Sequence, residues 1–151
     1  MIEINNLTAN EIDEEFLRKI VIAVLEGEKI GPEVELSIAF LGPGRMRSLN
    51  RRYRRKNRVT DVLAFPESEI IFKKFKVGPF QKTRSLGEIV ICLREVKKNA
   101  KRFSTFFEKE LATCLIHGLL HLLGYDHERG GDEAKKMEAK QNYYLKKIGL
   151  S

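Results

Sequence analysis

Cysteine is scarce in this chain, where Cys92 and Cys114 are the only two among 151 residues. Two cysteines are too few for the disulfide framework of a small secreted domain, so we expect both to be reduced thiols. Long hydrophobic runs are also lacking, because no stretch approaches the roughly 20 apolar residues of a membrane-spanning helix. The opening segment MIEINNLTANEIDEEF carries acids where a secretory signal has lysines and an apolar run. These absences predict a cytoplasmic protein without a membrane partner.

Internal repeats, low-complexity tracts and Ser- or Pro-rich linkers are absent too, and a chain of this length usually forms one core. We therefore expect a single domain over residues 1–151. Strands precede most of the helices in the hydrophobic pattern, which favours an α+β fold. Strands are predicted at 2–6, 34–41, 59–65 and 87–93, and helices at 10–28, 45–58, 94–103, 106–124 (opened by a Thr105–Glu108 capping box) and 132–148.

Positive charge is concentrated in one segment. Residues 45–58, RMRSLNRRYRRKNR, contain eight lysines or arginines and no acid, whereas the rest of the chain has 20 basic and 21 acidic residues. The whole net charge of +7 thus comes from fourteen positions, which indicates an anionic partner. Met46, Leu49 and Tyr53 share one helical face, which leaves the arginines on the others. No RNA-recognition motif with stacking aromatics is evident.

Histidine is limited to three residues, His117, His121 and His127, all within the apolar stretch CLIHGLLHLLGYDHE at 114–128. On a helix the first two lie about 40° and roughly 6 Å apart, so both rings can face one ion. The third would lie about 15 Å from the first if the helix continued. Gly124 stands where the helix must end, because glycine readily adopts the left-handed conformation that closes helices. The spacing therefore predicts that three imidazoles bind one ion.

Three neutral imidazoles leave a divalent metal with its +2 charge and one open position, the pattern of catalytic rather than structural zinc sites. Such a metal can lower the pKa of a bound water to about 7 and favours an anionic substrate. We expect one divalent transition metal per chain, with Zn²⁺ as the first candidate. Asp126 or Glu128 could orient an imidazole or the water. Cys114 lies roughly 10 Å along the helix from His121, so we expect it in the core.

The histidine spacing matches the metzincin pattern H-E-x-x-H-x-x-G-x-x-H with one departure. Where those proteases carry the glutamate that serves as general base, this chain has Gly118. A Met-turn is not apparent either. A metallopeptidase therefore stays an alternative that lacks its proton-transfer residue.

Four motifs, HGLLHLLGYDH, LNRRYRRKNRVTDVLAFP, LGEIVIC and EAKKMEAKQNYYL, resemble those of the YbeY family over roughly residues 36–145. These bacterial metal-dependent endoribonucleases act in ribosomal RNA maturation and ribosome quality control. The resemblance implies a zinc-type metal on the three histidines, hydrolysis of single-stranded RNA and a functional Arg54. It also implies a small mixed sheet of about four strands packed with about five helices, with the metal in a cleft. The chain departs from the commonest family pattern at Asn57, Val59, Ala64 and Glu88.

The arginines have a physical role that does not depend on the resemblance. The guanidinium of Arg54 can hold a phosphate through two hydrogen bonds and stabilise transition-state charge. Arg51, Arg55 and Arg58, with Arg52 beside them, would form a strip for the RNA backbone, with salt-sensitive affinity. We therefore predict an endoribonuclease with Arg54 and Asp126 as catalytic residues, acting on ribosomal RNA with the ribosome or its proteins as further partners. A zinc-stabilised, non-catalytic RNA- or ribosome-binding module is the non-enzymatic alternative.

Overall fold

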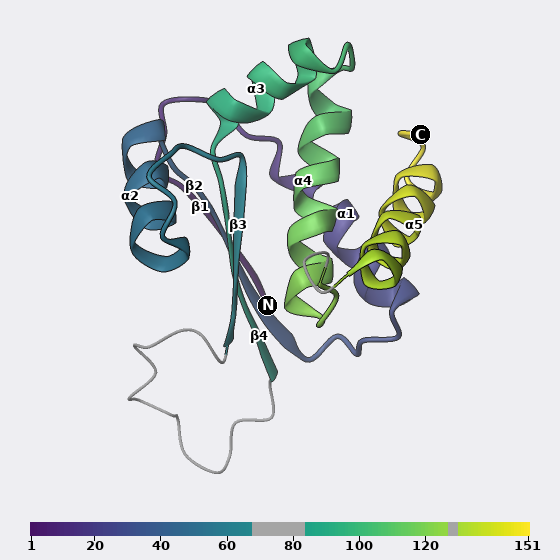
Figure 1. Ribbon diagram of the computed structural model, residues 1–151. Helices are drawn as coiled ribbons and strands as arrows, with labels where there is room; N and C mark the ends of the chain where they lie inside the picture. The colour runs from purple at the N-terminus through teal and green to yellow at the C-terminus, as the bar shows by residue number, and fades with distance from the viewer. Residues whose placement is uncertain (68–83, 127–129) are drawn as a thin grey trace, which may run out of the picture.

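The computed structural model describes residues 1–67, 84–126 and 130–151 (Figure 1). In these residues four strands and five helices follow one another in the order that the sequence predicts. None of the helices described is long and apolar enough to span a bilayer. The elements are β1 (Ile2–Asn6), α1 (Glu14–Gly27), β2 (Val34–Phe40), α2 (Pro43–Arg54), β3 (Val62–Pro66), β4 (Arg84–Ile91), α3 (Leu93–Arg102), α4 (Phe107–Leu122) and α5 (Gly131–Lys147).

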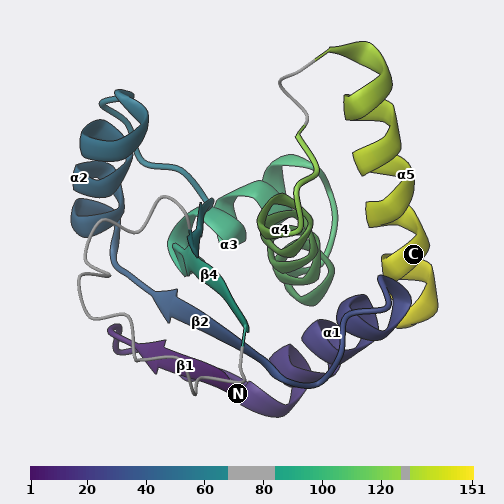
Figure 2. The same ribbon diagram turned by 90° about the horizontal axis from the view of Figure 1, so that it is seen from below.

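The strands form one mixed sheet in the order β1-β2-β4-β3. β1, β2 and β4 run parallel, and β3 pairs antiparallel with β4 at the edge. Helix α2 lies on one side of the sheet, whereas α1, α4 and α5 lie on the other (Figure 2). The predicted apolar face of α2 is confirmed, because Met46 is fully buried in a small cluster with Leu63 and Phe65 of β3. The mixed sheet and the helices packed on it confirm the predicted α+β fold.

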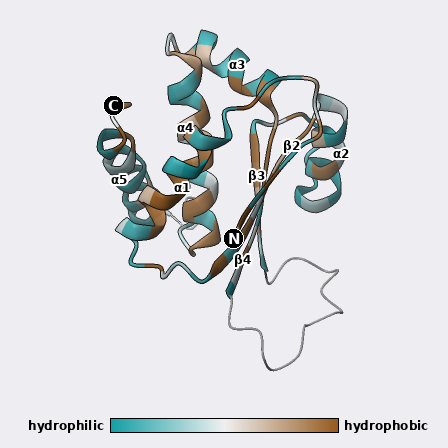
Figure 3. Ribbon diagram, turned by 180° about the vertical axis from the view of Figure 1, so that it is seen from behind, coloured by the Kyte–Doolittle hydropathy of each residue, from teal (hydrophilic) through white to brown (hydrophobic). Residues whose placement is uncertain are grey.

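Helix α4 is buried on most sides, as expected for a helix that is hydrophobic almost all round. Leu115, Ile116, Leu119 and Leu120 are fully buried in the main core between the sheet and the helices. Figure 3 shows hydrophobic residues along the strands and hydrophilic ones over much of α2 and α5. Cys92 and Cys114 are buried free thiols, as predicted. His117 and His121 thus lie on a helix that is buried on most sides.

Several helix ends differ from the sequence prediction; α1, for example, begins at Glu14 and not at residue 10, with Asp13 as its N-cap. The basic helix ends at Arg54 and not at residue 58, because Arg55 takes the left-handed conformation (φ 57°) as its C-cap. The predicted Thr105–Glu108 capping box is wrong: α4 begins at Phe107, and its N-cap Phe106 makes no side-chain capping bond. Thr105 is occupied in closing α3 instead, since its backbone N–H donates to the Ala100 carbonyl at 2.9 Å.

A carboxylate network joins α1 to α5 and to the turn after α4. Glu28 accepts hydrogen bonds from Tyr125 Oη at 2.5 Å, from Lys140 Nζ at 3.0 Å and from the Tyr144 hydroxyl. Burial raises the pKa of Glu28, but these three donors outweigh burial and leave the pKa below its ordinary value. The network ties the turn after α4, which carries Tyr125, to the end of α1 and to α5.

We predict that Glu28→Gln lowers the free energy of unfolding by about 1–2 kcal/mol at pH 7, since the ionised acceptor of these bonds is lost. Because the folded-state pKa is lowered, this stability is present above the unfolded pKa of about 4.3 and disappears as the pH falls through the folded value. Denaturant unfolding at pH 7 and near pH 3 tests this. The exposed Glu26→Gln on the same helix is the control, and an equal effect of both variants would contradict the prediction.

Candidate active site

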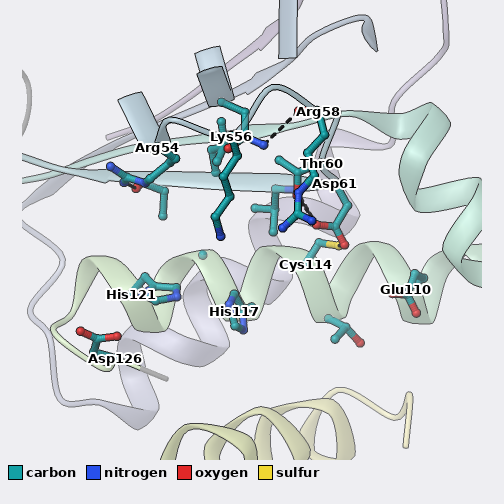
Figure 4. A pocket seen from close by; sticks show the side chains of 16 residues that line it. Arg54, Lys56, Arg58, Thr60, Asp61, Glu110, Cys114, His117, His121 and Asp126 are labelled. Carbon is teal, nitrogen blue, oxygen red and sulfur yellow. Dashed lines mark hydrogen bonds between the residues drawn. The ribbon is translucent and has the colours of Figure 1, made fainter. Parts of the chain in front are cut away.

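A cleft of about 600 Å³ separates α4 from the end of α2 and from β3 (Figure 4). One wall is the face of α4 that carries two of the histidines, and the other carries basic side chains. The lining residues are Asn50, Arg54, Lys56, Arg58, Thr60, Asp61, Val62, Leu63, Ala64, Glu110, Thr113, Cys114, His117, Gly118, His121 and Asp126.

His117 and His121 lie one turn apart on α4 and face this cleft (Figure 4). Their ring centroids are 4.8 Å apart, with an angle of 73° between the ring planes. Both side chains are partly exposed on an otherwise buried helix. Two converging imidazoles of this kind are a donor set that suits a divalent transition metal.

Gly118, between the two histidines, lets α4 pack closely on β4. A Cβ added at this position would lie 3.0 Å from Cγ2 of Ile89, which is tighter than ordinary contact. The glutamate that a metzincin carries here would therefore have to enter the packed interface between helix and sheet. The departure seen in the sequence thus has a steric basis, and it argues against the peptidase alternative.

The end of α4 confirms that Gly124 breaks the helix. Gly124 has φ 102°, its N–H donates to the His121 carbonyl at 3.0 Å, and the Tyr125 N–H donates to the Leu120 carbonyl at 3.0 Å. These two bonds form a Schellman closure, which turns the chain away from the helix axis. Asp126 consequently lines the cleft beyond His121 (Figure 4). His127 lies outside the described residues, so its predicted role stays a prediction.

Gln141 of α5 contacts His117 from a neighbouring helix. Its Oε1 forms a hydrogen bond with Nδ1 of His117. An amide oxygen only accepts, so this contact favours the tautomer in which Nδ1 carries the proton and Nε2 has the lone pair that a metal requires. Gln141 is not among the residues selected from the sequence, although it follows Ala134 and Met137 at helical spacing in the last helix. A polar side chain on an otherwise apolar face was the available signal.

Arg54 is held on the opposite wall, at the end of α2. Its Nη2 donates to the Ala64 carbonyl of β3 at 2.7 Å, and its guanidinium lies 5.0 Å from the ring centre of Phe65. These contacts fix the guanidinium across from the histidines (Figure 4). A cation positioned before the substrate arrives loses little entropy on binding it.

The other basic residues divide into two groups. Arg58 lines the cleft as part of the chain that follows α2, and Lys56, which sequence reasoning did not select, points across the cleft toward α4 (Figure 4). The buried Asn50 holds this segment, since its Nδ2 donates to the Arg58 carbonyl at 2.9 Å. Arg51 and Arg55 are exposed and do not line the cleft. The cleft therefore brings together only part of the predicted arginine strip.

A second group of candidate ligands lies toward the Glu110 end of the cleft. Ligand atoms of Asp61, Glu110 and Cys114 lie within 4.8 Å of one another. Among the described residues, this is the group of three side chains close enough together to hold a metal ion. Burial, and then Asp61, raise the pKa of Glu110 and of the Cys114 thiol. The thiol donates to Asp61 Oδ2 at 3.4 Å, and Asn99 donates to the same oxygen at 3.0 Å. This hydrogen-bonded group joins the residue before β3 to α3 and α4. Its thiol and one carboxylate already bond to each other, so the histidine pair is the better metal-binding candidate.

Fold and cleft together define a class: a small α+β protein whose candidate metal-binding histidines face cations across one cleft. A model of the family described as Endoribonuclease YbeY matches residues 3–149. Proteins named endoribonuclease YbeY from Bacillus thuringiensis (strain Al Hakam) and Bacillus cereus (strain AH187) are 36% identical to this chain over 143 residues, 93% of this chain and 91% of each relative. The solution structure of TM1509 from Thermotoga maritima is 32% identical and matches with a TM-score of 0.63, over 98% of this chain and 89% of that one.

The chain therefore belongs to the endoribonuclease YbeY family. The predicted family, the fold class and the assignment to hydrolytic enzymes of the endoribonuclease type are confirmed.

Proposed function

We propose that this protein is a metal-dependent endoribonuclease that cleaves single-stranded RNA, with ribosomal RNA as its substrate in maturation and ribosome quality control, and that residues 1–151 act as one domain. The observation that carries the proposal is the pairing of His117 and His121 with the fixed guanidinium of Arg54 across one cleft. The names of the relatives support an RNA substrate. Further partners would be the ribosome or its proteins.

The metal would be held by His117, His121 and His127, with Zn²⁺ as the first candidate because imidazole nitrogen suits it. When bound, such an ion supplies Lewis-acid chemistry and a water more acidic than bulk water. Gln141 positions His117 for this role through the Nδ1 hydrogen bond. Asp126, which lines the same cleft, would accept a proton from an attacking group or orient it.

The basic wall would bind the phosphodiester. Arg54 contacts the non-bridging oxygens of the scissile phosphate and stabilises the negative charge that grows in the transition state. Lys56 and Arg58 add positive charge within the cleft. Arg51 and Arg55, outside the cleft, bind the flanking backbone through contacts that weaken with salt.

Cleavage assays on purified protein test this function and separate it from the alternatives. We expect an unstructured RNA to be cut and the same sequence in a duplex to resist. Cleavage of casein and not of RNA would establish the metallopeptidase, and RNA binding without cleavage under any added divalent metal would establish the binding module. Product ends decide the nucleophile: a 2′,3′-cyclic phosphate would exclude direct attack by water.

Gln141→Ala should weaken metal binding about 10- to 100-fold, because the partner that fixes the tautomer and orientation of His117 is lost. Gln141→Glu keeps an acceptor at this position and should retain near-normal affinity. Metal titration followed by RNA cleavage checks this, and excess metal should restore the rate of the alanine variant. The neighbouring exposed Asn142→Ala is the control. An unchanged titration midpoint for Gln141→Ala would remove Gln141 from the site.

A further inference from the structure

Two exposed phenylalanines stand at the corner between α3 and α4. Phe103, the C-cap of α3, is 60% exposed, and Phe106, the N-cap of α4, is 51% exposed. An aromatic ring this exposed adds little to the core. Both rings are therefore available to a binding partner.

The corner is a fixed structure and not a loose loop. The Ser104 N–H donates to the Lys101 carbonyl at 3.3 Å, and the Thr105 N–H donates to the Ala100 carbonyl at 2.9 Å, which together close α3 as a Schellman motif. Ser104 adopts the left-handed conformation (φ 53°) that this closure needs. A rigid corner holds the rings in place before a partner arrives, which lowers the entropy cost of binding.

The surroundings of the two rings are basic. Residues 94–109 contain six lysines or arginines and two glutamates. The Arg102 guanidinium lies 5.5 Å from the Phe103 ring centre, and Lys97 Nζ lies 5.9 Å from that of Phe107. Lys98 and Lys101 are exposed on the same helix. Exposed aromatics among cations are the combination that binds single-stranded nucleic acid, by stacking of bases and by contacts to phosphates.

The corner lies beyond the Glu110 end of the cleft, the end opposite Asp126 (Figure 4). Glu110 lines that end of the cleft, and its N–H donates to the Phe106 carbonyl at 3.2 Å, so Phe106 lies one helical turn beyond it. Eleven positions separate Phe106 from His117, about 16 Å along the axis of α4. Figure 1 shows the corner at the end of α4 where α3 joins it, so an RNA strand that follows α4 out of the cleft would arrive there.

We propose that the α3–α4 corner is a second RNA-binding surface, on which Phe103 and Phe106 stack unpaired bases while Lys98, Lys101 and Arg102 bind phosphates. The inference rests on the proposed function, since it places one substrate along both the cleft and the corner. It adds a reason for preferring single strands, because bases inside a duplex present no open faces to the rings. No recognition motif in the sequence signals this surface, since its aromatics flank a turn between two helices.

A fluorescent reporter tests the stacking directly. The chain contains no tryptophan, so Phe103→Trp introduces the sole indole. We expect an unstructured RNA 12-mer to quench its emission, and the same 12-mer in a duplex to leave it unchanged. Ile22→Trp, at an exposed apolar position on α1, is the matched control and should not respond. Absence of quenching in Phe103→Trp, when the protein still cuts the 12-mer, would overturn the corner and leave the proposed function intact.

Binding measurements supply the second test. The Phe103→Ser/Phe106→Ser double variant should bind the 12-mer at least about tenfold more weakly by fluorescence anisotropy, with an unchanged circular dichroism spectrum and an unchanged cleavage rate on a dinucleotide. Lys98→Ala/Lys101→Ala should instead flatten the dependence of log affinity on log salt. Full affinity of the double serine variant would overturn the proposal. A change in oligomeric state by sedimentation with that variant, without loss of RNA affinity, would overturn it in favour of a protein interface. Quenching in a protein that cleaves no RNA would support the corner and refute the proposed function.

Discussion

His121→Ala should remove the bound metal and lower RNA cleavage by at least about 1,000-fold, on the scale of a lost metal-dependent mechanism. The side chain lies beside His117 with its ring 4.8 Å away, so its removal leaves one described imidazole where two converge. A metal site that has lost one of its imidazole ligands binds a divalent ion much more weakly. Metal content by mass spectrometry of the purified protein and single-turnover cleavage of an unstructured RNA check both losses together.

Thr113→Ala is the matched control for this variant. Thr113 lines the same cleft on α4, and its Oγ1 is bonded to the Lys109 carbonyl at 2.8 Å. Replacing Thr113 removes one hydrogen bond within the helix and leaves both histidines in place. Metal content and cleavage rate should therefore stay within about twofold of those of the parent protein. Cleavage by His121→Ala at the parental rate would mean that the histidine pair has no part in the reaction.

Arg54→Ala should lower kcat by about 100- to 1,000-fold while the metal content stays unchanged, the range measured when one fixed transition-state donor is removed. Arg54→Lys should recover little of this loss, because an ammonium cannot reproduce the two-pronged contact to phosphate. The guanidinium is fixed by Ala64 and Phe65, so a lysine would also lose its orientation. Separate determination of kcat and KM tests whether the effect lies in the transition state.

The neighbouring arginine provides the control. Arg52 is exposed, lies 5.4 Å from the ring centre of Tyr53 and does not line the cleft. Arg52→Ala should therefore change kcat by less than about twofold, as expected for an exposed charge. An equal loss of activity in both variants would contradict this prediction, and so would an effect of Arg54→Ala on KM alone. Either result would mean that the total charge of the helix, and not the fixed guanidinium, supports the reaction.

Features of the fold and site that depend on local sequence were predictable. The four-residue histidine spacing sets the face of the helix, and Gly124 supplies the left-handed residue that its closure needs, so both followed from backbone geometry. The apolar face of α2 was predictable for the same reason, since Met46, Leu49 and Tyr53 repeat at helical spacing. Each of these inferences spans no more than about two turns of helix.

The features missed by sequence reasoning depend on contacts between distant segments. Gln141 meets His117 across 24 positions, and Asp61 meets Cys114 across 53, distances over which a single sequence carries no pairing signal. The sequence also does not show which arginines line the cleft, because this depends on the end of α2 at Arg54. Arg58 lines the cleft from the segment after α2, where Asn50 bonds to its backbone carbonyl.

The central claim is that RNA cleavage depends on a metal held by the histidines of this cleft. The most direct test measures metal content and RNA cleavage on the same preparation before chelation, after chelation and after the metal is added back. We predict about one transition metal per chain, loss of cleavage with loss of the metal, and recovery in proportion to the metal restored. Full cleavage by protein from which all metal has been removed would contradict the account.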